Sequence, residues 1–431
     1  MSPAVDAGSR QQMRERTRYN PLPARIRVPL YPVPWSLAQL LRVSLGRTAA
    51  KEAPWGLLAR AGADVAERLG GRGQVLLTSS GTCALTLALR ALKRGDTDEV
   101  ILCSFNCPSV IEAVLGAGMV PVCCDVGEAF NLSVDTVRPL LGPRTRAVIM
   151  THVFGLGAAA GALQRLCQEA GVALIDDAAQ AFGESEEGRP LGSWGDFGVL
   201  SFGRHKPLFA GGGGALVCRD RALVEPLRRQ LGPAPRRRRR DALALLAVDR
   251  ASRVSSSVRA SSLRFTDVVD ALEAYPSDVK LTAMDGLSAR LLLTQLPLLE
   301  SYGLRARRFA RRYVEALRDV DGVTVVPAYA RGLPNFFTLL CPPEQRPALA
   351  AHLSARGIES TWLYYPLHRL SRFQRFARSA LPRCEALWMR TLCIPCRGWH
   401  DEAQIEWVIR ALRSFRAAPA ARSARQERQG P

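Results

Sequence analysis

Short apolar runs alternate with helix-forming segments between residues 75 and 218, and this alternation limits the fold more than any other feature. The runs that we expect to form strands are 75–78, 100–103, 120–125, 147–151, 172–175, 199–202 and 215–218. Segments with helical character, such as 109–117 and 162–170, separate most of them. Strands joined through helices favour a parallel sheet with right-handed crossovers. The sequence therefore predicts an α/β domain with a mostly parallel, seven-stranded sheet and helices on both faces.

The remainder of the chain follows a different pattern. Residues 287–302 and 305–317 give one long periodic helical stretch, and short strands at 323–326 and 336–340 come after it. Helices at 346–357 and 401–413 complete a small C-terminal α+β domain. We therefore divide the chain into an N-terminal arm (1–50), a large α/β domain (51–290), a linking long helix (291–320), a small C-terminal domain (321–415) and a disordered tail (416–431).

The charge of the chain is strongly positive and uneven. The net charge is +20, and the segment from Arg228 to Arg264 alone holds eleven arginines against two aspartates. This segment lacks the aromatic interleaving and the fold motifs of nucleic-acid modules, so we interpret residues 228–280 as a basic insert and expect no nucleic-acid partner.

The apolar runs indicate where in the cell the protein is found, and the cysteine spacing indicates whether it binds a metal. No apolar run reaches the roughly 18 residues of a membrane span. Arginines interrupt the first 20 residues, which argues against a signal peptide and for a cytoplasmic protein. The eleven cysteines include one CxxC, Cys393 to Cys396, without a second pair, so we expect reduced thiols and no metal site.

Two residues with complementary chemistry follow apolar runs. Asp177 follows the run 172–175, and Lys206 follows the run 199–202. In a parallel sheet both would emerge at the carboxyl edge, where such sheets bind ligands. Only four of the 59 basic residues are lysines, and an arginine cannot supply the amine nucleophile that a Schiff base needs. The pair suggests pyridoxal phosphate, although an isolated lysine can also be a simple surface residue.

The stretch Ser79-Ser80-Gly81-Thr82 connects the first apolar run to a helix that is apolar almost all round. Such a helix should be buried. Its first amides lack partners within the helix and favour an anion. A plain N-cap by Ser80 or Thr82 would explain the same residues without a ligand. Both interpretations stay open at this point.

Five motifs occur in a fixed order: SSGT, DDAAQA, GDFGVLSFGRHK, GGGGALV and YYPLH. In this order they resemble the DegT/DnrJ/EryC1/StrS sugar aminotransferase family, over residues 55–413. The resemblance implies the type I fold of transferases that depend on pyridoxal 5'-phosphate, and a homodimer. It also implies amino transfer from an amino acid, L-glutamate, to a nucleotide-linked keto-sugar. The product would serve a surface polysaccharide or a glycosylated natural product.

The resemblance also assigns roles to residues. Lys206 would form the Schiff base with the cofactor and then move a proton. Asp177, and not its neighbour Asp176, would pair with the pyridine nitrogen and keep it protonated. The remaining residues expected to bind the cofactor are Gly81, Thr82, the amide of Cys83 and Ser201 at the phosphate, Gln180 against the ring or its oxygen, and Cys107 at the stacking position.

Several positions depart from the family pattern. Cys107 stands where an aromatic ring is usual, and Phe105 nearby could substitute for it. The segment 281–284 replaces an asparagine motif that reaches the phosphate across the dimer, and Gly212 replaces an acid. Arg204, His205 and Arg369 are the side chains that we expect to meet the diphosphate of a nucleotide sugar.

Alternatives remain for the insert and for the function. The insert could form amphipathic helices on an anionic membrane surface or a lipid-linked or nucleotide substrate, or it could be a solvated loop. A dehydratase that uses pyridoxamine phosphate would carry histidine in place of the lysine, so Lys206 argues against it. A sensor or binding protein that keeps the fold without turnover is the third alternative.

Overall fold

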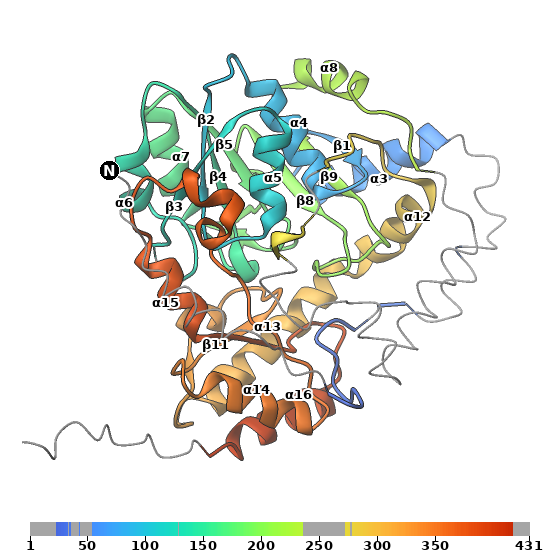
Figure 1. Ribbon diagram of the computed structural model, residues 1–431. Coiled ribbons are helices and arrows are strands. Elements are labelled where there is room, and N and C mark those ends of the chain that lie inside the picture. The colour runs from blue at the N-terminus through green and yellow to red at the C-terminus, as the bar shows by residue number, and fades with distance from the viewer. Residues whose placement is uncertain are drawn as a thin grey trace, which may run out of the picture.

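The computed structural model describes residues 23–32, 34–35, 43, 54–127, 129–235, 272–275 and 278–416. A seven-stranded sheet forms the centre of the larger lobe (Figure 1), in the order β1-β9-β8-β5-β4-β2-β3. Its strands are β1 (Gln74–Thr78), β2 (Glu99–Cys103), β3 (Val120–Cys124), β4 (Thr145–Thr151), β5 (Ala173–Asp177), β8 (Phe197–Ser201) and β9 (Gly214–Cys218). The predicted seven strands are confirmed.

Strand β9 alone runs against the others. It pairs antiparallel with β1 and with β8, whereas the remaining pairs of the sheet are parallel. A loop without a helix can join antiparallel neighbours, but parallel neighbours need a crossover. The connection from β8 to β9 is such a loop, residues 202–213, and it carries Lys206 at the carboxyl edge of the sheet.

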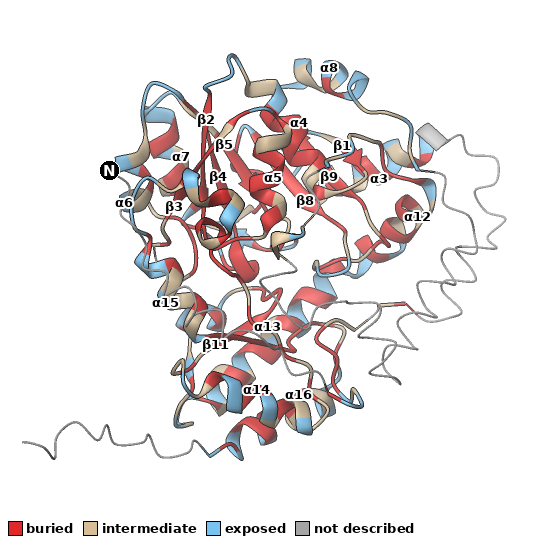
Figure 2. Cartoon of the chain, in the orientation of Figure 1, coloured by how far each residue is buried: buried red, intermediate tan, exposed pale blue. Residues whose placement is uncertain are grey.

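Helices cover both faces of this sheet. The steps from β1 to β2 and from β2 to β3 lead toward one side of the sheet, and the step from β4 to β5 leads toward the other. Right-handed crossovers therefore place α4 (Gly81–Leu92) and α5 (Pro108–Gly116) on one face and α7 (Ala160–Glu169) on the opposite face. Figure 2 shows α4 almost entirely buried, as its sequence predicts.

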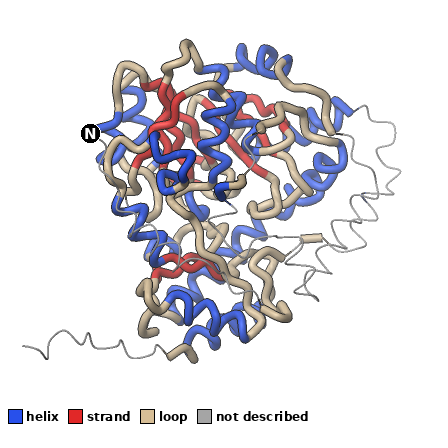
Figure 3. Tube along the Cα trace, viewed as in Figure 1, coloured by secondary structure: helices blue, strands red, loops and turns tan. Residues whose placement is uncertain are grey.

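A smaller antiparallel sheet, β10-β11-β12, lies in the second lobe (Figure 3). Its strands are β10 (Thr324–Val325), β11 (Phe337–Leu340) and β12 (Thr391–Ile394), and its helices are α13 (Leu299–Ala316), α14 (Arg346–Ala355), α15 (Pro382–Arg390) and α16 (Glu402–Arg413). The expected α+β arrangement is confirmed, although the sequence had indicated neither β12 nor α15.

The remaining elements are short or peripheral. They are α3 (Pro54–Arg68), α6 (Val134–Val137), α8 (Val224–Arg229), α12 (Gly286–Gln295), the hairpin of β6 (Ser185–Glu186) and β7 (Arg189–Pro190), and the 3-10 turns η2 (Arg138–Leu140), η3 (Val153–Gly155), η4 (Arg221–Leu223), η5 (Leu296–Leu298), η6 (Pro327–Ala330), η7 (Leu367–Arg369) and η8 (Ser371–Phe376). Among the described helices, none combines the length and the apolar character of a membrane span.

The long helical stretch divides at a different residue from the one predicted. The sequence had placed its division at residues 303–304, but α12 ends at Gln295 and α13 runs without interruption from Leu299 through Gly303. Pro297 explains the division, because proline lacks an N–H and its ring clashes with the preceding turn. A 3-10 turn, Leu296–Leu298, connects the two helices there.

Part of the N-terminal arm lies against the second lobe. Val28 forms a parallel bridge with Ile358, and the carbonyl oxygen of Pro29 lies 2.8 Å from the Nε2 atom of His400. The amide of Leu30 donates a 2.8 Å hydrogen bond to Glu359. Residues 1–22 of the arm, residues 236–271 of the basic insert and the tail after 416 lie outside the described residues, and so does the prediction of membrane contact.

Candidate active site

The carboxyl ends of neighbouring strands meet at one edge of the large sheet. Asp177 closes β5, and Thr151 is its register partner at the end of β4. Thr151 donates a 3.0 Å hydrogen bond to Oδ2 of Asp177, and the amide of Ala179 donates a 3.1 Å bond to Oδ1. Asn106 in turn donates to the Thr151 hydroxyl at 2.9 Å. This chain of donors fixes both the position and the orientation of the Asp177 carboxyl.

Lys206 acts electrostatically on the same carboxyl. Asp177 is 3% exposed, and burial raises its pKa above the ordinary range. The positive charge of Lys206 is the largest influence in the opposite direction. Because burial disfavours the charged form of the Asp177 carboxyl, a cationic partner at the edge of the sheet would stabilise that form.

Asp176, the neighbouring acid, points to the other face of β5, because side chains alternate along a strand. Its Oδ1 lies 2.7 Å from Nε2 of His152, and its Oδ2 accepts hydrogen bonds from the amides of Gly192 and Trp194. The amide of Ala158 donates to Nδ1 of His152, which leaves the proton on Nε2 for Asp176. Asp176 is therefore fully satisfied inside the protein.

The loop that carries Lys206 is held by the second lobe. Arg397 donates 2.6 Å to the carbonyl oxygen of Lys206, and Asn335 donates 3.0 Å to the carbonyl oxygen of His205. Arg397 also donates 2.8 Å to Oδ1 of Asn335. Its guanidinium is 2% exposed and lies 5.2 Å from the ring centre of Tyr31. In the described parts of the chain, no carboxylate forms an ion pair with Arg397.

The start of α4 forms a narrow cradle with the ends of β8 and β9. A Cβ atom on Gly81 would lie 2.9 Å from Cβ of Ser201, and one on Gly214 would lie 2.4 Å from the Gly81 nitrogen. Only glycine allows the three backbones to approach this closely. The cradle brings together Ser201 and the first turn of α4, where an anion is favoured.

The amide expected from Cys83 is already used. Ser80 is the N-cap of α4, and its Oγ accepts a 3.0 Å hydrogen bond from the Cys83 nitrogen. The N-cap interpretation is confirmed for Ser80, while the anion interpretation stays a prediction for Gly81, Thr82 and Ser201 at the cradle. A ligand anion at the Cys83 amide would have to share that donor with Ser80.

Gln180 and Cys107 are the two other side chains expected to bind the cofactor. Gln180 is 2% exposed and its Oε1 accepts a 3.1 Å bond from the amide of Phe154. Cys107 is half-buried and is the N-cap of α5. Tyr275, at the end of the insert, lies beside it: Cys107 and Ser109 both influence the pKa of Tyr275, which burial raises to about 12.

The expectation for Phe105 is wrong. Its side chain is 0% exposed and packs among aromatic rings, with centroid distances of 6.0 Å to Phe130, 6.0 Å to Phe154 and 6.1 Å to Tyr364. Because this ring belongs to the core, it has no free face for a ligand.

Arg369 and His205, which were expected to meet a diphosphate, contact other side chains of the protein. Arg369 forms a two-bond ion pair with Glu385, at 2.8 and 2.5 Å. His205 stacks on Tyr31 with a centroid distance of 3.9 Å. His205 is itself exposed. Arg204 is exposed next to it.

Known proteins share this fold and these motifs. Residues 62–413 match the DegT/DnrJ/EryC1/StrS aminotransferase family. The chain belongs to this family. A dTDP-4-dehydro-2,3,6-trideoxy-D-glucose 4-aminotransferase of Saccharopolyspora spinosa is 31% identical to it over 78% of this chain and 82% of its own length.

Two further relatives illustrate the range of the likeness. A UDP-N-acetyl-3-dehydro-alpha-D-glucosamine 3-aminotransferase of Acidithiobacillus ferrooxidans is 32% identical over 78% of this chain and 82% of its own length. The crystal structure of DesV from S. venezuelae, in complex with a ketimine intermediate, superimposes with a TM-score of 0.72 and 27% identity, over 90% of this chain and 98% of that one.

Proposed function

We propose that the protein is a pyridoxal-phosphate-dependent aminotransferase that moves an amino group from L-glutamate to the ketone of a nucleotide-linked sugar. The observation that carries the proposal is the position of Lys206 and the buried Asp177 at the same carboxyl edge of the sheet, after the neighbouring parallel strands β8 and β5. The names of the relatives from S. spinosa and A. ferrooxidans support the sugar substrate. A homodimer, with each site at the interface between subunits, is part of the proposal.

The residues present fit the cofactor. Asp177 offers a buried, oriented carboxyl that lacks a cationic hydrogen-bond partner of its own in the described residues, as a protonated pyridine nitrogen requires. The glycine cradle at Gly81 and Gly214, bordered by Ser201, suits a phosphate group. Lys206 supplies the amine. When bound, the cofactor provides the electron sink that stabilises negative charge on the substrate carbon.

Each side chain then has a defined task. Lys206 would hold the cofactor through its amine and would move the proton at the α-carbon of the amino acid as a general base. Asp177 would hold the proton on the pyridine nitrogen. Thr151 and Asn106 orient the Asp177 carboxyl through their hydrogen bonds. Ser201 and the first turn of α4 would bind the phosphate, and Gln180 would lie against the ring.

The environment of the lysine suits an anionic acceptor. Arg204 and Lys206 supply positive charge next to each other, and Arg397 adds a buried charge behind the loop. Clustered positive charge attracts the diphosphate of a nucleotide-linked sugar and the carboxylates of glutamate alike. We therefore expect both substrates to enter at this edge in turn.

Borohydride reduction followed by peptide mapping tests the cofactor assignment. We expect a phosphopyridoxyl group on the peptide that contains Lys206. Lys206→Ala should lose it, whereas Lys93→Ala, which alters a lysine paired with Asp96 on the surface, should keep it. Absence of the adduct from Lys206 in the wild type contradicts the proposal and favours the sensor or the dehydratase.

A panel of nucleotide-linked keto-sugars tests the acceptor. The protein is first loaded with glutamate, and each sugar is then added while the absorbance of the aldehyde form of the cofactor is followed. One or more sugars should restore that absorbance and yield an amino sugar by mass spectrometry. If glutamate converts the cofactor but no sugar restores it, the acceptor assignment fails while the cofactor assignment stands.

A further inference from the structure

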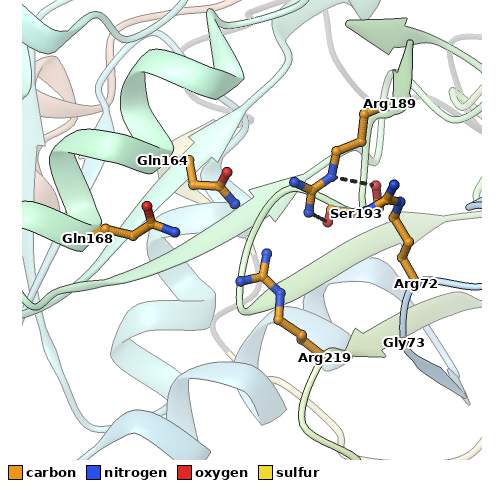
Figure 4. A pocket seen from close by; sticks show the side chains of 7 residues that line it. All are labelled: Arg72, Gly73, Gln164, Gln168, Arg189, Ser193 and Arg219. Atoms are coloured by element: carbon orange, nitrogen blue, oxygen red, sulfur yellow. Dashed lines mark hydrogen bonds between the residues drawn. The ribbon is translucent and has the colours of Figure 1, made fainter. Parts of the chain in front are cut away.

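A pocket rich in arginine lies away from Lys206. Its volume is about 400 Å³, and its lining residues are Arg72, Gly73, Gln164, Gln168, Arg189, Ser193 and Arg219. Figure 4 shows the two glutamines of α7 on one side and the three arginines on the other. The glutamines are four residues apart, so both project from the same face of the helix.

The pocket lies at the amino edge of the sheet. Arg72 and Gly73 precede the first residue of β1, and Arg219 follows the last residue of the reversed strand β9. The cradle at Gly81 and Ser201 lies at the other ends of β1 and β8. A strand of this length spans roughly 16 Å, at about 3.3 Å per residue. The pocket and the candidate active site are therefore separate.

Hydrogen bonds hold several of the lining side chains in place. The Arg189 guanidinium donates to the carbonyl oxygen of Ser193 and lies 4.6 Å from the ring centre of Trp194. Arg219 donates 2.8 Å to the carbonyl oxygen of Trp194, and Gln164 donates to the same oxygen. Groups fixed in this way lose less conformational entropy when a ligand binds.

The positive charge of the pocket is only partly compensated. Burial, then the charges of Arg219 and Arg72, lower the pKa of Arg189. Across the part of the chain that the structure describes, Asp196 is the one carboxylate paired with these arginines, 3.8 Å from Arg219. Three guanidinium groups thus repel one another around a concave surface, and an anion would relieve that repulsion.

We propose that this pocket binds a small anion that contains a diphosphate group. Guanidinium groups match phosphate oxygens with two parallel hydrogen bonds, and the glutamine amides can donate to further oxygens. An anion with two or more charges offsets three arginines better than a monoanion does. The site is independent of the proposed amino transfer and uses none of its residues.

Isothermal titration calorimetry of the full chain, saturated with pyridoxal phosphate, tests the proposal with inorganic pyrophosphate as the probe. The double variant Arg72→Ala/Arg219→Ala should bind pyrophosphate at least roughly tenfold more weakly than the wild type, because two charge-assisted donors are lost. The matched control is Arg311→Ala/Arg413→Ala, which removes the same charge from exposed positions on α13 and α16. This control should bind within about twofold of the wild type.

Three results would overturn the proposal. The first is that pyrophosphate does not bind to the wild type, and the second is that the pocket variant binds it as tightly as the wild type does. The third is that both double variants bind it equally weakly, which would mean that the positive surface as a whole attracts pyrophosphate. The single variant Arg72→Ala, at an exposed position, gives the same comparison if the double variant unfolds. A second arm with UDP separates the sources of the group, and only the part of the affinity that the pocket variant loses counts, because UDP can also enter the candidate active site. A loss equal to that for pyrophosphate supports a free diphosphate ligand, and a larger loss supports a nucleoside diphosphate.

Discussion

Arg397 donates a hydrogen bond of 2.6 Å to the main-chain carbonyl oxygen of Lys206, across 191 residues of sequence. This hydrogen bond holds the main chain of the loop in position and does not involve the side-chain amine of Lys206. Asn335 adds a second contact one residue earlier, at His205. The second lobe therefore positions the candidate catalytic lysine, and the two lobes cannot separate at this point without releasing it.

Replacement of Arg397 should reduce amino transfer. Arg397→Lys cannot reproduce the two separate donors to Lys206 and Asn335, and we expect kcat to fall roughly 10- to 100-fold, since a displacement of about 1 Å can have this effect. The change should appear in kcat more than in KM, together with a shifted pH dependence of the cofactor absorbance.

Arg346→Lys is the control for a buried arginine. Arg346 is 1% exposed, lies between Trp362 and Trp388, and donates to the carbonyl oxygen of Trp388. This variant should lower thermal stability and leave kcat of the folded fraction unchanged. Equal loss of kcat in both variants would show that Arg397 acts through stability alone.

The two adjacent acids should respond differently to amide substitution. Asp177→Asn should leave the fold intact and reduce amino transfer roughly 100-fold or more, because an amide does not hold a proton on the pyridine nitrogen. Asp176→Asn should lower the free energy of unfolding by about 1–3 kcal/mol, since the network with His152, Gly192 and Trp194 needs an acceptor. Urea unfolding and single-turnover kinetics on both variants measure the contrast, and a reversed pattern contradicts the assignment of roles.

A methyl group at Gly81 should close the anion cradle. Gly81→Ala places a Cβ 2.9 Å from Cβ of Ser201, so one of the two must move. We expect pyridoxal phosphate to bind roughly tenfold more weakly, a change of about 1.4 kcal/mol. Gly62→Ala in α3 is the control, because its nearest neighbour would be 3.4 Å away and alanine favours a helix. Fluorescence titration with the cofactor compares the two, and equal affinities argue against the cradle.

Glu385 should make stability depend on acid pH. Partial burial raises its pKa, but hydrogen bonds from His368 and Arg369 outweigh burial and lower it from 4.5 to about 2. A lowered pKa means that the folded state favours the charged form. The contribution is therefore complete above pH 4.5, decreases as pH falls, and is lost near pH 2.

Urea unfolding across this pH window, with Glu385→Gln as the comparison, measures that contribution. The difference in stability between wild type and variant should shrink as pH falls from 4.5 toward 2. A difference that stays constant over this window would mean that the ion pair with Arg369 does not control the titration.

Local patterns were sufficient to predict the seven strands of the large sheet and to single out the pair Asp177 and Lys206, whose roles stay a prediction. The apolar runs are short and regularly spaced, and a lysine is conspicuous among so many arginines. That same abundance hid Arg397, since no pattern separates one arginine from the rest. Strand β12 was missed because TLCI is only four residues long and pairs with β11 across about fifty residues.

Burial explains the other failures. Phe105 and Cys107 are two residues apart, and the sequence does not tell which of them lies in the core. Tyr275 comes from a segment whose composition indicates only a basic insert, yet its main-chain carbonyl oxygen accepts a 3.0 Å hydrogen bond from Arg372 in η8. Contacts of this kind depend on how distant segments dock, and periodicity contains no information about them.

The stacking of Tyr31 on His205 has a consequence for biosynthesis. The ribosome makes Tyr31 early and Arg397 late, yet both contact the loop around Lys206. The large sheet can begin to fold while translation continues, because domains generally fold as units from the N-terminal side. The lysine loop gains its second support only when nearly the whole polypeptide has emerged, so a truncated translation product would fold its sheet but remain catalytically incompetent.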